Sequence, residues 1–130
     1  MNKTLLVTAI FGLLAVALGA FGAHGIKPHI QADQYEVYQT AVLYHFIHTI
    51  VMLVLVLSIA NSRTTAIKWA IRLCVAGIIL FSGSLYLLST RELTGIESIS
   101  LLGPITPVGG LCFLGAWGMI AWHAKSIKRT

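Results

Sequence analysis

The sequence is poor in charge and in cysteine. Only 10% of its 130 residues are charged, against about 25% in an ordinary soluble domain, and this shortage excludes a typical water-soluble enzyme. Two cysteines are too few for a disulfide scaffold. Apolar residues make up 57% of the chain, which excludes an intrinsically disordered chain. Together with a mean hydropathy of +0.86, this composition predicts an integral membrane protein.

Four long apolar runs follow one another along the chain. A helix that crosses a bilayer needs about 20 mostly apolar residues, and each run has about that length. The runs are continuously apolar rather than alternating, which argues against a β-barrel. The fold class is therefore predicted to be all-α, a single membrane domain that forms a four-helix transmembrane bundle. The expected spans are about residues 5–23, which we expect to be retained rather than cleaved as a signal peptide, 37–60, 67–88 and 104–122.

Basic residues lie on one side of the predicted spans. That side has seven basic residues and no acid, namely Lys3, Arg63, Lys68, Arg72, Lys125, Lys128 and Arg129. The opposite loops hold two basic and four acidic residues, namely Lys27, Arg91, Asp33, Glu36, Glu92 and Glu97. The two sides together give the formal net charge of +5. Because loops rich in Lys and Arg stay in the cytoplasm, we expect both termini there.

Several residues in the spans have structural interpretations. Arg72 lies about one turn inside the third span, from which its long stem can reach the membrane surface. Cys74 and Cys112 fall within apolar runs and are expected to be small core residues. The three tryptophans near the predicted cytoplasmic ends are expected to anchor helices at the headgroups; they are Trp69, Trp117 and Trp122.

The second span carries a polar stripe. Tyr38, Ala41, His45, His48 and Met52 follow at alternating spacings of three and four residues, which places them on one face of a helix. His48 is expected about 16 Å below the outer end, at about 1.5 Å per residue. That depth is near the middle of a hydrocarbon core of about 30 Å. A histidine that faced lipid there would be costly, so the stripe is expected to face the bundle interior.

Other polar residues are expected at similar depths in the outer half of the bundle. They come from the end of the first span, the SGS segment of the third span, and the PITP segment that opens the fourth. We expect them to converge with the stripe into one polar cluster. The candidate cluster comprises His24, Tyr44, His45, His48, Ser82, Ser84 and Thr106.

Histidines one turn apart invite three interpretations. Two of them on one helix could share a metal, but zinc would need at least one further protein ligand, and none stands at a diagnostic spacing. A proton relay would use the titration of histidine near neutral pH. The structural interpretation is that both side chains form hydrogen bonds to hydroxyl groups of neighbouring helices. No metal or haem site is predicted.

The motifs of catalysis are missing. No hydrolase motif surrounds the serines, no carboxylate pair lies inside the spans, and no phosphate-binding glycine loop precedes a helix. The chain is therefore expected not to be an enzyme and to have no catalytic residues and no cofactor. Its positive charge is assigned to membrane orientation, not to nucleic acid.

Four ordered motifs carry a resemblance that covers nearly the whole chain. They are GAFGAHG at 19–25, Tyr44-His45 with His48, LFSGSLYLL at 80–88, and GPITPVGG at 103–110. With these motifs the chain resembles the YgdD-like small inner-membrane proteins, domain-of-unknown-function family 423. The resemblance implies a four-helix, multi-pass protein of the bacterial inner membrane. It implies no activity, because the family is uncharacterised.

The leading functional interpretation is a non-enzymatic small accessory or structural membrane protein whose surroundings are the lipid bilayer. One alternative is an oligomeric transport or permeation element, since a helix interrupted by proline can form a binding site. The other is a quinone, ligand or metal site in the outer polar cluster, because a quinone needs only a few polar groups and an apolar slot. A homo-oligomer and a larger membrane complex are both open.

Overall fold

The computed structural model describes residues 2–58, 64–95 and 102–126, and the predicted helical bundle is confirmed in these ranges. Four helical segments are long and apolar enough to cross a membrane: Lys3–His29, Ala32–Ser58, Thr65–Ser89 and Ile105–Lys125. Their bounds fall within a few residues of most expected span ends. The first segment extends to His29, beyond the expected end at 23, and the second begins at Ala32, before the expected start at 37. Residues 59–60 of the second expected span lie outside the described ranges.

Two of the four segments change helix type along their length. Helix α1 (Lys3–Phe21) continues into the π-helical turn η1 (Gly22–Ile26) and the 3₁₀ turn η2 (Lys27–His29). The third segment is α3 (Thr65–Gly77), the π-helical turn η3 (Ile78–Ser82) and α4 (Gly83–Ser89). The other helices are α2 (Ala32–Ser58), the short α5 (Arg91–Thr94) and α6 (Ile105–Ser126). Both prolines of the PITP segment precede or occupy the first turn of α6, where no backbone N–H is needed.

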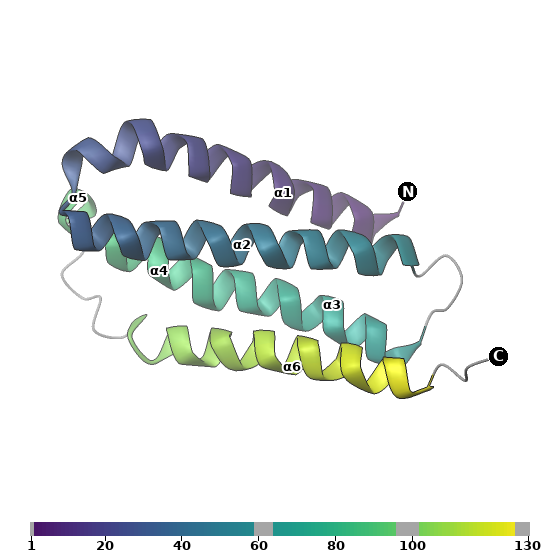
Figure 1. Ribbon diagram of the computed structural model, residues 1–130. Helices are drawn as coiled ribbons and strands as arrows, with labels where there is room; N and C mark the ends of the chain where they lie inside the picture. The colour runs from purple at the N-terminus through teal and green to yellow at the C-terminus, as the bar shows by residue number, and fades with distance from the viewer. Residues whose placement is uncertain (1, 59–63, 96–101, 127–130) are drawn as a thin grey trace.

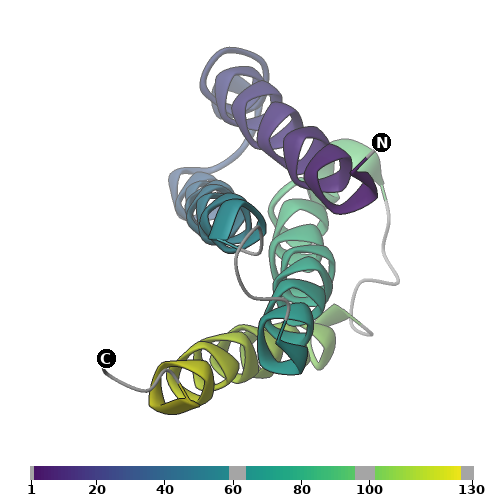
Figure 2. The same cartoon turned by 90° about the vertical axis from the view of Figure 1, so that its right-hand side faces the viewer.

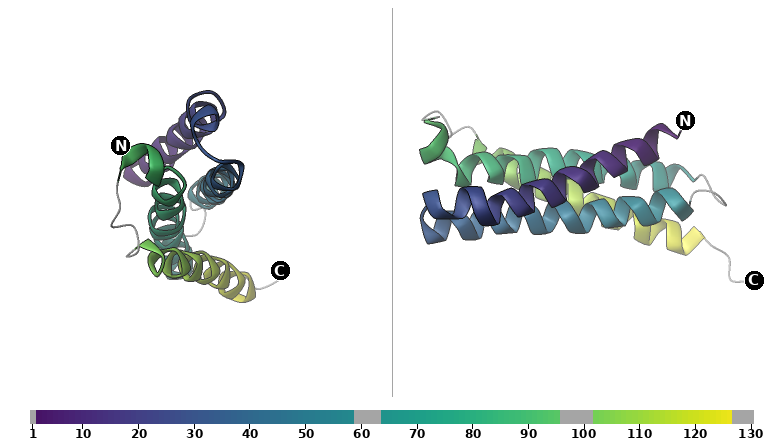
Figure 3. Two further views of the ribbon diagram at one scale, coloured as in Figure 1. Left: turned by 90° about the vertical axis from the view of Figure 1, so that its left-hand side faces the viewer. Right: turned by 90° about the horizontal axis from the view of Figure 1, so that it is seen from above.

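The four segments are arranged around a central pair. Helix α2 packs against η3 and α4, α1 packs on α2, and α6 packs on α3 and η3. Seen end-on, α1 and α6 lie at opposite ends of the assembly (Figures 2 and 3). The start of α1 and the end of α6 lie at the same end of the bundle, called the terminal end below, and α5 lies at the other, outer end (Figure 1). Helices α1 and α6 therefore expose most of their surface to the surrounding medium.

The core is mainly apolar from the middle of the bundle toward the terminal end, with Thr8 and Thr49 as buried polar side chains. The free thiol of Cys74 is buried in this core, as expected, whereas Cys112 is half-buried and is not one of the buried core residues. Burial of such side chains lowers the free energy of helix packing through dispersion contacts. The buried cluster consists of Met52, Leu55, Val56, Ile67, Ala70, Ile71, Cys74, Ile78, Phe113 and Ala116.

Tyr38 joins α1 to α2. Its ring lies so close to Gly22 that a Cβ there would overlap it, and its hydroxyl donates a hydrogen bond of 2.7 Å to the Leu18 carbonyl. Tyr38→Phe keeps the ring and removes only the hydrogen bond. We expect it to lower the free energy of unfolding by about 0.5–1.5 kcal/mol.

An SDS titration in mild detergent, followed by helical circular dichroism, measures this loss. Tyr35→Phe is the matched control, since Tyr35 stacks on Tyr38 but its hydroxyl makes no hydrogen bond within the described part of the chain. Equal losses in the two variants would show that the Leu18 bond contributes nothing.

Candidate functional site

The two histidines of α2 point to different neighbours. They lie at the middle of α2 and are both buried. Three residues of a helix turn by about 300°, so their side chains diverge by about 60°. His45 faces Phe11 of α1 and Tyr86 of α4, whereas His48 faces Phe113 and Trp117 of α6. The polar stripe of α2 faces the interior as expected, but its two histidines belong to two separate sites.

The first site, here the His45 cluster, consists of His45, Phe11, Tyr38 and Tyr86. His45 Nδ1 lies 3.2 Å from the Tyr86 hydroxyl. The edge of the Phe11 ring meets the imidazole with 5.7 Å between centroids, and Tyr86 meets Tyr38 at 5.1 Å. His45 Nε2 is buried without a hydrogen-bond partner among the described residues. Aromatic rings thus enclose this imidazole.

The second site, here the His48 cluster, consists of His48, Tyr44, Phe81, Phe113 and Trp117. The imidazole of His48 stacks on Phe113 with 3.6 Å between centroids and an interplanar angle of 14°. The ring of Tyr44, one turn earlier on α2, stacks on His48 with 6.0 Å between centroids. It also contacts Phe81 in a tilted arrangement at 4.7 Å and 42°. Rings from α2, η3 and α6 therefore meet around one histidine.

Hydrogen bonds define the protonation of His48. The Trp117 indole N–H donates to His48 Nε2 at 3.4 Å, and an indole nitrogen can only donate. Nε2 must then accept, so the neutral ring carries its proton on Nδ1. That N–H lies 2.9 Å from the Tyr44 carbonyl and donates to it. Both ring nitrogens are thus used within the protein.

The remaining polar residues of the predicted cluster separate. Ser84 and Thr106 lie 2.7 Å apart through their hydroxyls and join α4 to α6. Ser82 is fully buried, and its hydroxyl has no hydrogen-bond partner among the described residues. His24 lies in η1 on the exposed surface. The structure therefore brings Tyr44 and His48 together and Ser84 and Thr106 together, and places His45 and His24 elsewhere.

A groove of about 550 Å³ opens beside the His48 cluster. It runs between α2, η3 and α6, and the half-exposed ring of Trp117 forms part of its wall. Pro107 and Gly110 of α6 complete the wall at the outer side. His48 contributes only a ring surface that is 4% exposed, so the groove offers mainly apolar and aromatic contacts.

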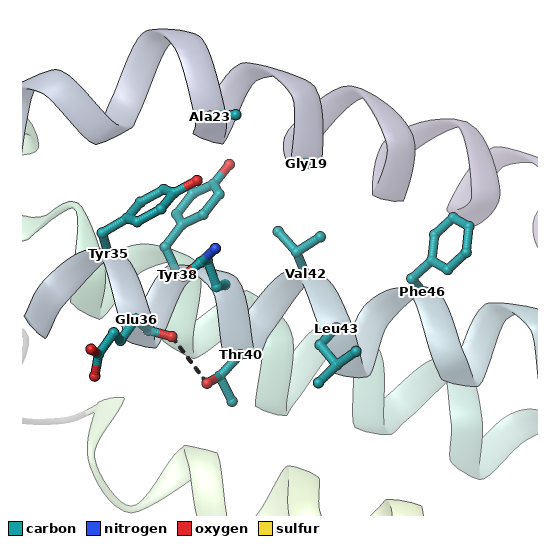
Figure 4. A pocket seen from close by; sticks show the side chains of 10 residues that line it. Gly19, Ala23, Tyr35, Glu36, Tyr38, Thr40, Val42, Leu43 and Phe46 are labelled. Atoms are coloured by element: carbon teal, nitrogen blue, oxygen red, sulfur yellow. Dashed lines mark hydrogen bonds between the residues drawn. The ribbon is translucent and has the colours of Figure 1, made fainter. Parts of the chain in front are cut away.

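A second groove, of about 760 Å³, lies between α1 and α2 toward the outer end. Figure 4 shows the rings of Tyr35 and Tyr38 rising from α2 toward Ala23 of α1, with Val42 and Phe46 further along. None of the histidines of the predicted cluster lines it. Glu36 and Thr40 also line it, from the side of α2 that faces away from α1 (Figure 4).

Metal binding finds little support in these arrangements. Within residues 2–58, 64–95 and 102–126, no three His, Cys, Asp or Glu side chains come together in a group that could hold a metal ion. The lone pair of His48 is taken by Trp117. The described acidic residues lie toward the outer end of the bundle, away from the two imidazoles in the middle of α2. They are Asp33 and Glu36 in the first turns of α2, and Glu92 in α5.

Five aromatic residues of these clusters were not among the residues that the sequence predicted for them, namely Phe11, Phe81, Tyr86, Phe113 and Trp117. Trp117 was expected to anchor at the headgroups, but it bonds to His48. Its position five residues before Trp122 puts it about 7.5 Å deeper, and an indole N–H at that depth needs a partner. The contact of His45 with the Tyr86 hydroxyl is of the kind expected for the histidines, but the sequence did not indicate which hydroxyl. The three phenylalanines gave no signal, because apolar and aromatic residues are common throughout the spans.

Comparison with known proteins relates the chain to uncharacterised membrane proteins. Residues 18–110 match the family model described as protein of unknown function DUF423. The chain is 45% identical to UPF0382 membrane protein YwdK of Bacillus subtilis, with 92% of this chain and 94% of that protein covered. It is 34% identical to UPF0382 inner membrane protein YgdD of Escherichia coli, with 96% and 91% covered. No solved structure matches the chain.

Proposed function

We propose that this chain, which belongs to the DUF423 family of membrane proteins of unknown function, is a non-enzymatic accessory or structural component of the bacterial inner membrane. The observation that carries this proposal is the way His48 is held. A catalytic or metal-binding imidazole presents a free nitrogen to the reacting atom or the metal. In His48 one nitrogen accepts from Trp117 and the other donates to Tyr44. We therefore assign His48 the task of joining α2 to α6.

The apolar core supports this assignment over transport. A path that selects a polar solute is lined by hydrogen-bonding or charged groups. In the described interior, the polar side chains of the His45 and His48 clusters give way to the buried apolar cluster around Met52 and Cys74 toward the terminal end. The packed apolar core therefore favours a structural role over transport through a single bundle.

Charge placement supports an orientation with both termini in the cytoplasm. The described basic residues of the terminal end are Lys3, Lys68, Arg72 and Lys125, and the described acids lie toward the outer end. Regions rich in Lys and Arg remain on the cytoplasmic side. The Escherichia coli relative is named an inner membrane protein, which supports the proposed location in the bacterial inner membrane.

Cysteine labelling tests the orientation. In a background with Cys74→Ala and Cys112→Ala, single cysteines are introduced as Gln31→Cys near the outer end and Thr65→Cys at the start of α3, both exposed positions. A membrane-impermeant maleimide is expected to label the first in intact cells and the second only after lysis. If intact cells label Thr65→Cys and not Gln31→Cys, the assigned orientation is wrong.

Co-purification tests the accessory role. The full-length protein is tagged, expressed at its native level, extracted in mild detergent and examined by mass spectrometry of proteins and small molecules. We expect a membrane protein at fixed stoichiometry that is absent from a purification of an unrelated, equally tagged four-span protein. Purified protein that by itself turns over a substrate, or that carries solute flux in proteoliposomes, would contradict the proposal.

Two variants identify the helix that contacts such a partner. Gly118→Leu enlarges the exposed face of α6 at a position where an added Cβ meets no atom within 4 Å. Ala17→Leu does the same on the exposed face of α1. Loss of the partner in one variant and its retention in the other assigns the contact to that helix, while both bundles stay folded.

A further inference from the structure

A small cleft lies between α1 and α3 at the terminal end of the bundle. It has a volume of about 260 Å³. Its floor is apolar and comes from three helices, with Val7 of α1, Met52 of α2, and Ile71 and Val75 of α3. Its rim is basic and is formed by Lys3 and Arg72. The cleft thus combines two positive charges with an apolar slot.

The two rim charges have no carboxylate partner in the part of the chain that the structure describes. The described acids, Asp33, Glu36 and Glu92, belong to the N-terminal part of α2 and to α5, toward the outer end. Arg72 places its guanidinium 5.2 Å from the centroid of the Trp69 ring, a contact that leaves its N–H donors free for an anion. The local charge of the rim is therefore unbalanced.

We expect the rim to lie near the boundary between headgroups and hydrocarbon, because both basic residues belong to the terminal-end parts of their helices. Lys3 is the first residue of α1. Arg72 comes seven residues after the start of α3, or about 10 Å along the helix. A cation at that level is costly unless it reaches the surface or meets an anion. The apolar floor continues below the rim into the hydrocarbon.

We propose that this cleft binds one anionic phospholipid, with its phosphate between Lys3 and Arg72 and one acyl chain along the apolar floor. Arginine suits this task because its planar fork can donate two parallel hydrogen bonds to a phosphate. Basic pockets between membrane helices bind anionic headgroups for the same electrostatic reason. The floor favours a lipid over a soluble phosphate, which would leave Val7 and Val75 without a contact.

Native mass spectrometry of the full-length protein in mild detergent tests the site. Phosphatidylglycerol and phosphatidylcholine are added at equal concentration, and phosphatidylglycerol is expected to bind in preference. Arg72→Gln and Lys3→Gln are each expected to lower its apparent affinity about five-fold, the effect of one basic residue near an anionic membrane surface. Lys125→Gln, on α6 at the same end, is the matched control and is expected to leave the affinity unchanged.

Two further variants test the apolar floor without changing charge. Val7→Trp is expected to fill the cleft and abolish the preference, and Leu13→Trp, on an exposed face of α1, is expected to preserve it. An equal loss in Lys125→Gln, unchanged binding in Val7→Trp, or displacement of the lipid by an equal concentration of inorganic phosphate would each overturn the proposal. The first outcome would indicate diffuse attraction, and the last would assign the site to a soluble anion.

Discussion

Gly109→Ala is expected to lower the free energy of unfolding by about 3 kcal/mol or more, the upper part of the range for overpacked cores. At Gly109, α6 lies directly against the backbone of η3. An added Cβ would overlap the Phe81 backbone nitrogen and lie 2.7 Å from the Phe81 Cα. A side chain can rotate away from such a contact, but the backbone of a packed helix cannot. The whole of α6 would have to move away from η3.

The neighbouring glycine provides the control for this prediction. A Cβ at Gly110 would meet the Phe81 ring at 3.9 Å, an ordinary van der Waals distance. Gly110→Ala is therefore expected to change stability by less than about 1 kcal/mol, with the higher helix propensity of alanine in its favour. Both variants are measured by SDS titration of helical circular dichroism. Equal stability of the two would contradict the close approach of α6 to η3.

His48→Ala is expected to lower the free energy of unfolding by about 2–4 kcal/mol, a range typical of large-to-small substitutions in a core. The substitution removes the ring that stacks on Phe113 at 3.6 Å. It also leaves the Trp117 indole N–H without its acceptor. The same SDS titration measures the loss. If His48→Ala is as stable as the original protein, His48 does not have the structural role proposed for it.

A double-mutant cycle separates the hydrogen bond from the packing. His48→Phe keeps a flat ring against Phe113 and removes the nitrogen that accepts from Trp117. Trp117→Phe removes the donor. Each change is expected to cost about 1 kcal/mol, and the double variant is expected to cost less than the sum, since both remove the same bond. Full additivity would show that the two side chains do not interact.

The sequence predicts the membrane fold well because composition and run length decide it. Four apolar runs of about 20 residues have few alternatives to membrane helices. The burial of His45 and His48 also follows from the sequence, since a histidine that faced lipid at that depth would be costly. The same reasoning correctly predicts that Cys74 is a core residue rather than a disulfide partner.

The arrangement of the polar residues could not be predicted in the same way. His45 and His48 share a stripe, yet a rotation of about 60° sends them to different helices. The π-helical turn η3 adds a residue to one turn and so changes which faces Ser82 and Ser84 occupy, a shift that an α-helical period does not predict. Likewise His24 lies in the π-helical turn η1 and is exposed. Rotation, register and helix crossing depend on contacts between segments distant in the sequence.

Nitrogen NMR of histidine-labelled protein in lipid bilayers tests whether His48 is a neutral structural link between α2 and α6. His48→Gln assigns its signal by difference. We expect a ring protonated on Nδ1 with an unprotonated Nε2, and a change in the Nε2 signal in Trp117→Phe. A His48 ring that carries protons on both nitrogens, or on Nε2 alone, would contradict the structural role and favour a site that exchanges protons or binds a ligand.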